Sequence, residues 1–252
     1  MQNNNVYQNN GRNGNGNGFN NTNGKTIKTI ELPRLETLEP DFDLRFEDVE
    51  DYEQTEVLTK SPEQMQAVEN AIHALLDAFN VNWEDPNYTD TPKRVAKAYL
   101  DYWANGYARD PKEEITVFPN TSKSDDMVIV KDMRFHSLCS HHLAPIEGYA
   151  AIAYVPDKHL LGLSKLGRIL EIYARRFQLQ ERIGQQTADA IMDLLQPKGV
   201  MIVLYNVTHG CMSSRGVKLH EANTTTMTSR GAFKDNPALR TEMMSLLNLR
   251  NP

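Results

Sequence analysis

Apolar residues take on a regular helical spacing from about residue 61 onward. Serine followed by proline, as at Ser61-Pro62, favours a helix start because serine caps free backbone N–H groups and proline suits the first turn. The apolar positions that follow recur three and four residues apart, which predicts an amphipathic helix. Thr91-Pro92 begins a second pattern of the same kind. The spacing predicts a small helical subdomain over residues 61–118.

The second half of the chain changes between strand-like and helix-like patterns. Runs rich in Val, Ile and Tyr predict strands, and longer amphipathic runs predict helices. Two strand pairs that flank a pair of helices favour an α+β domain over residues 119–252, with the helices on one face of a four-stranded antiparallel sheet. The expected elements are strands over 127–134 and 146–155, helices over 163–176 and 178–195, strands over 199–208 and 224–229, and a helix over 236–247.

The first 60 residues carry no such pattern. Residues 1–25 are dominated by Asn and Gly, and residues 31–56 are strongly acidic with scattered apolar side chains. Segments that can bury so little apolar surface stay disordered. We therefore expect residues 1–60 to be a disordered, acidic extension. Its acidic segment is either a solvated tail or a docking site for a regulator.

Composition and charge exclude several classes of protein. Hydrophobic residues make up 40% of the chain and charged residues 24%, which is ordinary for a soluble globular protein. The formal net charge of -6 argues against nonspecific binding to nucleic acid or to an anionic membrane. No apolar run approaches the roughly 20 residues that span a bilayer, and the N-terminus lacks the apolar core of a secretory signal. We expect a cytoplasmic protein.

The only two cysteines of the chain both stand close to histidines. Cys139 lies three residues before His142, and Cys211 lies two residues after His209. Cys139, His142 and Cys211 could hold one metal ion, and a zinc ion with three protein ligands keeps a fourth position for water, which is the catalytic arrangement. The alternative is that each cysteine is a buried free thiol that packs as a small hydrophobe.

Two further histidines would lie beside such a metal. His141 and His209 titrate near neutrality and could move protons around a hydrolytic site. The alternative is a purely structural role for each imidazole.

A set of polar and cationic residues suggests a polyphosphate subsite. Several of them fall on the first turns of predicted helices, where free N–H groups already favour anions. Ordinary surface charge is the alternative for each one. The set comprises Ser164, Lys165, Arg168, Arg215, Arg94 and Lys97.

A carboxylate stands beside Gln180 at the start of the second helix of the pair. Glu181 could accept two parallel hydrogen bonds from the N1–H and N2–H2 edge of guanine. The alternative is a first-turn glutamate that interacts favourably with the helix dipole.

Five segments, in order, resemble the motifs of the GTP cyclohydrolase I family. The resemblance extends from about residue 61 to 250. The matching segments are the helix at 91–97 (TPKRVAK), the zinc loop at 136–145 (HSLCSHHLAP), the G-L-S-K segment at 161–166 (LGLSKL), the Q-x-Q-E-R segment at 178–182 (QLQER), and the H-x-C-x-x-x-R-G segment at 209–216 (HGCMSSRG).

The resemblance implies a fold, a reaction and a role for each residue. The family fold is the tunnelling fold, and the family assembly is a homodecamer of two pentamers with its sites between subunits. The implied reaction is the zinc-dependent hydrolytic opening of the guanine imidazole ring of GTP, which releases formate and forms 7,8-dihydroneopterin triphosphate. The implied roles are zinc ligation by Cys139, His142 and Cys211, proton transfer by His141, His209 and Ser164, guanine binding by Glu181 with Gln180, and triphosphate or ribose binding by Lys165, Arg168, Arg215, Arg94 and Lys97, with Ser164 also in that subsite.

Two positions depart from the family pattern. Ser140 stands where the family usually has glutamate, and Ser213 stands where a basic residue is common. One alternative is therefore a zinc-binding or regulatory homologue that has lost catalysis. Another is a tunnelling-fold enzyme acting on a different purine or pterin, although the retained Lys165, Arg168 and Arg215 disfavour an unphosphorylated substrate.

Overall fold

The computed structural model describes residues 60–215 and 220–248. Apart from Lys60, the N-terminal extension and the question of a regulator bound to it lie outside the described residues. None of the described helices is long and apolar enough to cross a bilayer.

The predicted helix starts near residues 61 and 91 are confirmed. Helix α1 spans Pro62–Ala78, and the Ser61 hydroxyl accepts a hydrogen bond from the Gln64 backbone N–H at 3.1 Å. Helix α2 spans Thr91–Ala98 and continues into a π-helical turn, η3, at Tyr99–Trp103. A 3-10 turn, η4 (Asn105–Ala108), and a short helix, α3 (Pro111–Glu114), complete the helical segment.

This helical segment is hydrogen-bonded to the rest of the chain. The Gly106 N–H donates to the carbonyl of Arg175 at 2.9 Å, and the Phe177 N–H donates to the Tyr107 hydroxyl at 3.0 Å. These bonds anchor η4 to the connection that follows the first long helix of the α+β region. The division at residue 118 into two domains stays a prediction.

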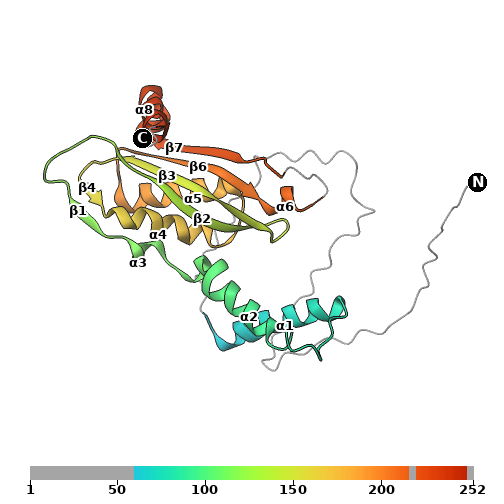
Figure 1. Ribbon diagram of the computed structural model, residues 1–252. Coiled ribbons are helices and arrows are strands. Elements are labelled where there is room, and N and C mark those ends of the chain that lie inside the picture. Colours follow the sequence, from blue (N-terminus) through green and yellow to red (C-terminus); the bar gives the residue numbers. More distant parts are fainter. Residues whose placement is uncertain (1–59, 216–219, 249–252) are drawn as a thin grey trace, which may run out of the picture. The chain divides into compact units, whose positions relative to one another are not determined.

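A five-stranded sheet forms the centre of the α+β region, in the order β5-β2-β3-β6-β7 (Figure 1). The four expected strands are present and antiparallel, while a fifth short strand, β5, runs parallel to β2. A separate small sheet pairs β1 with β4. The strands are β1 (Val117–Pro119), β2 (Val128–Cys139), β3 (Pro145–Val155), β4 (His159–Leu161), β5 (Phe177–Gln178), β6 (Gly199–His209) and β7 (Thr224–Gly231).

The expected helix pair packs on one face of the five-stranded sheet. Helix α4 spans Leu163–Ala174 and α5 spans Gln180–Leu195. Their apolar faces meet inward-facing residues of β2, β3 and β6 in the main core. Fully buried members of this core include Phe135, Ile152, Leu166, Ile183 and Leu204.

The other face of the sheet is partly covered as well. Helix α7 (Ala232–Asp235) and helix α8 (Pro237–Asn248) follow β7, and Figure 1 shows α8 on the side of the sheet opposite to α4 and α5. Phe233 and Met243 form a second buried cluster with residues of β3 and β6. The sequence predicted the last helix, while its position on the second face is a finding of the structure.

A β-bulge in β2 lies on this second face. The pairing of β2 with β3 shifts between Val130 and Met133, and Asp132 takes a left-handed conformation with φ 60°. The Tyr205 hydroxyl donates to the Asp132 carboxylate at 2.6 Å and accepts from the Asp132 N–H at 3.1 Å. Burial, followed by the bond to Asp132, raises the pKa of Tyr205 to about 12.

Candidate metal centre

A tight turn after β2 brings the first two candidate ligands together. The Cys139 N–H donates to the Ala144 carbonyl at 2.8 Å, and the Cys139 carbonyl accepts from the N–H of Leu143 at 2.8 Å. Leu143 takes the left-handed conformation, with φ 53°, that reverses the chain. His142 Nδ1 lies 3.8 Å from Cys139 Sγ as a result. The first ligand is therefore the last residue of a strand, whereas the sequence placed it on the connection between strands.

Strand pairing brings the third candidate ligand to the same end of the sheet. Leu138 of β2 faces Pro145 of β3, and the next residue of β3 faces His209 of β6. The chain then forms helix α6 (Gly210–Ser213), which carries Cys211. A Cβ at Gly210 would lie 3.1 Å from Pro145 Cδ, so glycine allows β3 and α6 to approach closely here. The ligand atoms of Cys139, His142 and Cys211 all lie within 4.8 Å of one another.

The three donors fit a zinc ion. Zinc prefers thiolate and imidazole ligands at about 2.3 and 2.0–2.1 Å, so in a tetrahedral site a sulfur and a nitrogen ligand are separated by about 3.6 Å. The 3.8 Å between Cys139 Sγ and His142 Nδ1 matches this separation. Burial, followed by the neighbouring Cys139 thiol, raises the pKa of the Cys211 thiol. A bound cation would act in the opposite direction and favour the thiolate.

A buried amide and the hydroxyl of one threonine lie beside His209, and a second threonine contacts the amide. Gln180 is 2% exposed, and its Oε1 lies 2.8 Å from His209 Nε2. Thr224 Oγ1 donates to the same oxygen and lies 3.2 Å from His209 Nε2. The Gln180 amide N–H donates to Thr226 Oγ1 at 3.2 Å. Burial lowers the pKa of His209, and the carboxylate of Glu181 opposes that shift.

Two further predicted site residues lie at this cluster. Arg215 Nη1 donates to His142 Nε2 at 2.6 Å. The ring of His141 lies edge-on to that of His142, with 6.0 Å between the centroids. His141, His142 and the Glu181 side chain near His209 are exposed, so the cluster opens to solvent.

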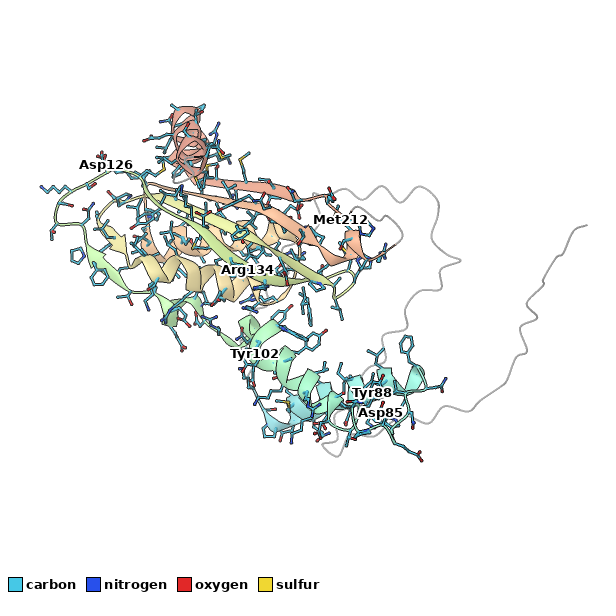
Figure 2. The ribbon with its side chains drawn as sticks, viewed as in Figure 1. Asp85, Tyr88, Tyr102, Asp126, Arg134 and Met212 are labelled. Carbon is cyan, nitrogen blue, oxygen red and sulfur yellow. The ribbon has the colours of Figure 1, made fainter. Side chains whose placement is uncertain are left out.

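Helix α4 carries three other predicted residues, two of them in its first turn, at the end of the helix away from the metal ligands. A Cβ at Gly167 would lie 3.7 Å from Met133 Sδ, in the middle of β2, whereas the Arg176 carbonyl after α4 accepts from the Ser137 hydroxyl near Cys139. Helix α4 therefore runs along β2, and its start lies about 18 Å from the metal end. Figure 2 shows the two ends of the sheet, with Met212 at α6 and Asp126 before β2. Ser164 and Lys165 lie in the first turn of α4, and Arg168 follows in its second turn, near the middle of the helix.

The remaining predicted cations are also separate from the cluster within one chain. Helix α2, which carries Arg94 and Lys97, packs mainly on α1 and η3. Arg94 forms an exposed ion pair with Asp90 at 3.3 Å, and Arg168 forms one with Glu114 at 3.2 Å. The resemblance implies sites between subunits, and within the described residues a single chain brings together only the part around the metal ligands.

Most of the chain, including the metal cluster, is similar to proteins of one known family. Residues 68–248 match the family described as GTP cyclohydrolase I. The chain belongs to the GTP cyclohydrolase I family. A relative named GTP cyclohydrolase 1 from Streptococcus pyogenes serotype M18 (strain MGAS8232) is 45% identical over 181 residues, which cover 71% of this chain and 91% of the relative. Another of that name, from Streptococcus suis (strain 05ZYH33), is 43% identical over 186 residues, or 72% and 96% of the two chains.

One solved structure has a low structural similarity to this member of the GTP cyclohydrolase I family. It is described as the archaeosine synthase QueF-Like in the apo form, at 16% sequence identity and a TM-score of 0.36, covering 44% of this chain and 98% of that chain.

The two departures from the GTP cyclohydrolase I motifs leave the ligand cluster intact. The side chain of Ser140 is exposed, and its N–H donates to the Gln178 carbonyl at 3.0 Å, which joins the turn to β5. The Ser213 hydroxyl donates to carbonyls of His209 and Gly210 at 3.4 and 3.5 Å, within its own short helix. Neither serine displaces one of the three candidate ligands.

Sequence reasoning missed Thr224 and Thr226. The run of threonines predicted a strand, and alternation places residues 224 and 226 on one face of it. Their contact with Gln180 depends on the pairing of β7 with β6, which no motif revealed.

Proposed function

We propose that this chain is a zinc-dependent GTP cyclohydrolase I, which opens the imidazole ring of the guanine of GTP, releases formate and forms 7,8-dihydroneopterin triphosphate. The observation that carries the proposal is the cluster of Cys139, His142 and Cys211 with His209 and Glu181 beside it, in a chain of this family. The names of the Streptococcus relatives support the same activity.

Each part of the cluster would have its own task in this reaction. A bound zinc ion supplies a hydrolytic nucleophile at neutral pH by lowering the pKa of water. His209 would give a proton to the purine nitrogen that leaves as the ring opens. The candidates for proton transfer to the ribose oxygens in the later rearrangement are Ser164 and the exposed His141.

Arg215 would change partners when the metal binds. Its hydrogen bond to Nε2 of His142 needs a lone pair on that nitrogen. Ligation of a metal ion through Nδ1 leaves the imidazole proton on Nε2, so the two interactions exclude each other. We infer that metal binding frees the Arg215 guanidinium to bind a phosphate of the substrate.

The start of helix α4 in one copy of the chain would meet the metal cluster of another copy. Lys165 lies too far from the metal ligands of its own chain to share a substrate with them, because about 14 Å of helix separates it from Ala174 at the metal end of α4. Arg168, in the second turn, is paired with Glu114 of α3. Both edges of the sheet are open in the described residues, because nothing pairs with the outer side of β7 and β5 covers only the last two residues of β2. Open edges of this length favour pairing with another chain. We propose a ring of copies closed through these edges, stacked as a homodecamer.

A cytoplasmic location would suit the proposed metal site. Both cysteines are free, and thiolate ligands persist in a reducing compartment.

The test of the proposed function combines two measurements on one purified sample. We expect about one zinc ion per subunit by elemental analysis, together with formate and a fluorescent pterin formed from GTP. Zinc without either product would support the non-catalytic alternative. Products that persist after complete removal of the metal would contradict the zinc assignment.

Glu181→Ala is expected to abolish the preference for GTP over ATP. Loss of two charge-assisted hydrogen bonds to guanine corresponds to a fall of about 100-fold in kcat/KM for GTP. The measurement is formate release from both nucleotides. If Glu181 serves only the helix dipole, the variant will unfold more easily and keep its discrimination.

A further inference from the structure

We propose that Thr224 and Gln180 are positioning residues that hold His209 as the tautomer with its proton on Nε2. This inference rests on the proposed function only for its consequence, which is that His209 is held in a single orientation for ring opening. It assigns Gln180 to His209, whereas the sequence motif assigned it to guanine.

The argument begins with the burial of the Gln180 amide. Its side chain is almost completely shielded from solvent, so both ends of the amide need protein partners. The N–H end donates to Thr226 Oγ1 at 3.2 Å. The carbonyl end therefore faces His209, and Oε1 lies 2.8 Å from Nε2.

Thr224, the first residue of β7, stabilises this orientation of the Gln180 amide. Its hydroxyl donates to Gln180 Oε1, which holds the carbonyl end in place. The hydroxyl oxygen is also 3.2 Å from His209 Nε2, so two acceptor oxygens converge on one ring nitrogen. A neutral imidazole has one donor and one acceptor nitrogen, and two oxygens at Nε2 select the donor there.

A proton fixed on Nε2 determines the state of the other ring nitrogen of His209, Nδ1. Among the residues that the structure describes, no hydrogen bond reaches His209 Nδ1. With the proton on Nε2, Nδ1 of the neutral imidazole carries the lone pair. A rotated Gln180 amide would place its N–H at Nε2 and produce the opposite tautomer, so the orientation of one buried amide decides the chemistry of His209.

The strand offers a matched pair of variants. Thr224→Val keeps the shape and the β-branched side chain but loses the hydroxyl. Thr225→Val makes the same change on the next residue, whose exposed side chain points to the other face of β7. Thr224→Ser restores the hydroxyl on a smaller side chain.

Kinetic measurements on the full-length, zinc-loaded protein give the first readout. We expect Thr224→Val to lower kcat for formate release by about 10-fold to 100-fold, as is typical for a residue that orients a site side chain, with KM for GTP little changed. Thr224→Ser should recover most of the lost kcat, and Thr225→Val should match the unaltered protein. Equal losses in the two valine variants would overturn the proposal.

Solid-state 15N NMR of histidine-labelled protein gives a second readout that does not depend on activity. At a pH where the imidazole is neutral, we expect a protonated Nε2 on His209, assigned with His209→Gln, and a mixture of tautomers in Thr224→Val. A protonated Nδ1 in the unaltered protein would overturn the proposal even if formate is released. A protonated Nε2 in a protein that releases no formate would support the positioning role while the proposed function fails.

Discussion

Cys211→Ser is expected to lose bound zinc and formate release together. Serine keeps the size of the side chain but offers a neutral hydroxyl, which is a poor zinc ligand at neutral pH. Only Cys139 and His142 would remain, and two ligands cannot fix the open catalytic geometry. Changing partners that merely orient zinc ligands costs 10–100-fold, so loss of a ligand should lower kcat by at least about 100-fold.

Zinc content per subunit and formate release from GTP measure this outcome on the same preparation. Ser213→Ala is the matched control, because Ser213 lies in the same short helix and its hydroxyl donates to the backbone carbonyls of His209 and Gly210. The control should retain both zinc and activity. Unaltered activity in Cys211→Ser would refute the assignment of Cys211 as a ligand.

The long elements of this fold could be predicted because their patterns are local. Proline after serine or threonine marked the starts of α1 and α2, and runs with Val, Ile and Tyr marked β3 and β6. Strands of two or three residues, such as β5, are too short for alternation to reveal them. The face of the sheet on which α8 packs depends on tertiary contacts of Phe233 and Met243, which no local pattern contains.

Part of the candidate site could likewise be predicted from local patterns, and part depends on tertiary contacts. Spacing and residue type predicted a metal cluster of Cys139, His142 and Cys211, and the structure brings their ligand atoms together. The contacts of Gln180 with Thr224 and Thr226 were not predictable, because they depend on the register of β7 against β6 across a bulge between Leu204 and Val207. Motifs carry no distances, so beyond the intersubunit site that the resemblance implies they could not show how far Lys165 lies from the metal ligands of the same chain.

The distance between Lys165 and the metal ligands of the same chain predicts that two inactive variants can restore activity to each other. Lys165→Ala should be nearly inactive because it removes a phosphate ligand, and Cys211→Ser should be nearly inactive because it removes the metal. If each site takes its metal cluster from one chain and its cations from the next, co-expression of the two variants should restore activity. Random assembly of equal amounts leaves about one quarter of the sites with both halves intact.

The control for this complementation co-expresses Lys165→Ala with the double variant Lys165→Ala/Cys211→Ser. No chain in that mixture carries Lys165, so no arrangement of subunits can rebuild a complete site. Two different affinity tags, purified in sequence, ensure that the assayed protein contains both kinds of chain. Mixed oligomers of the two single variants that release no formate would contradict a shared site. Because α4 keeps Lys165 about 14 Å, measured along the helix, from Ala174 at the metal end of its own chain, a site built within one chain would then need a different phosphate ligand.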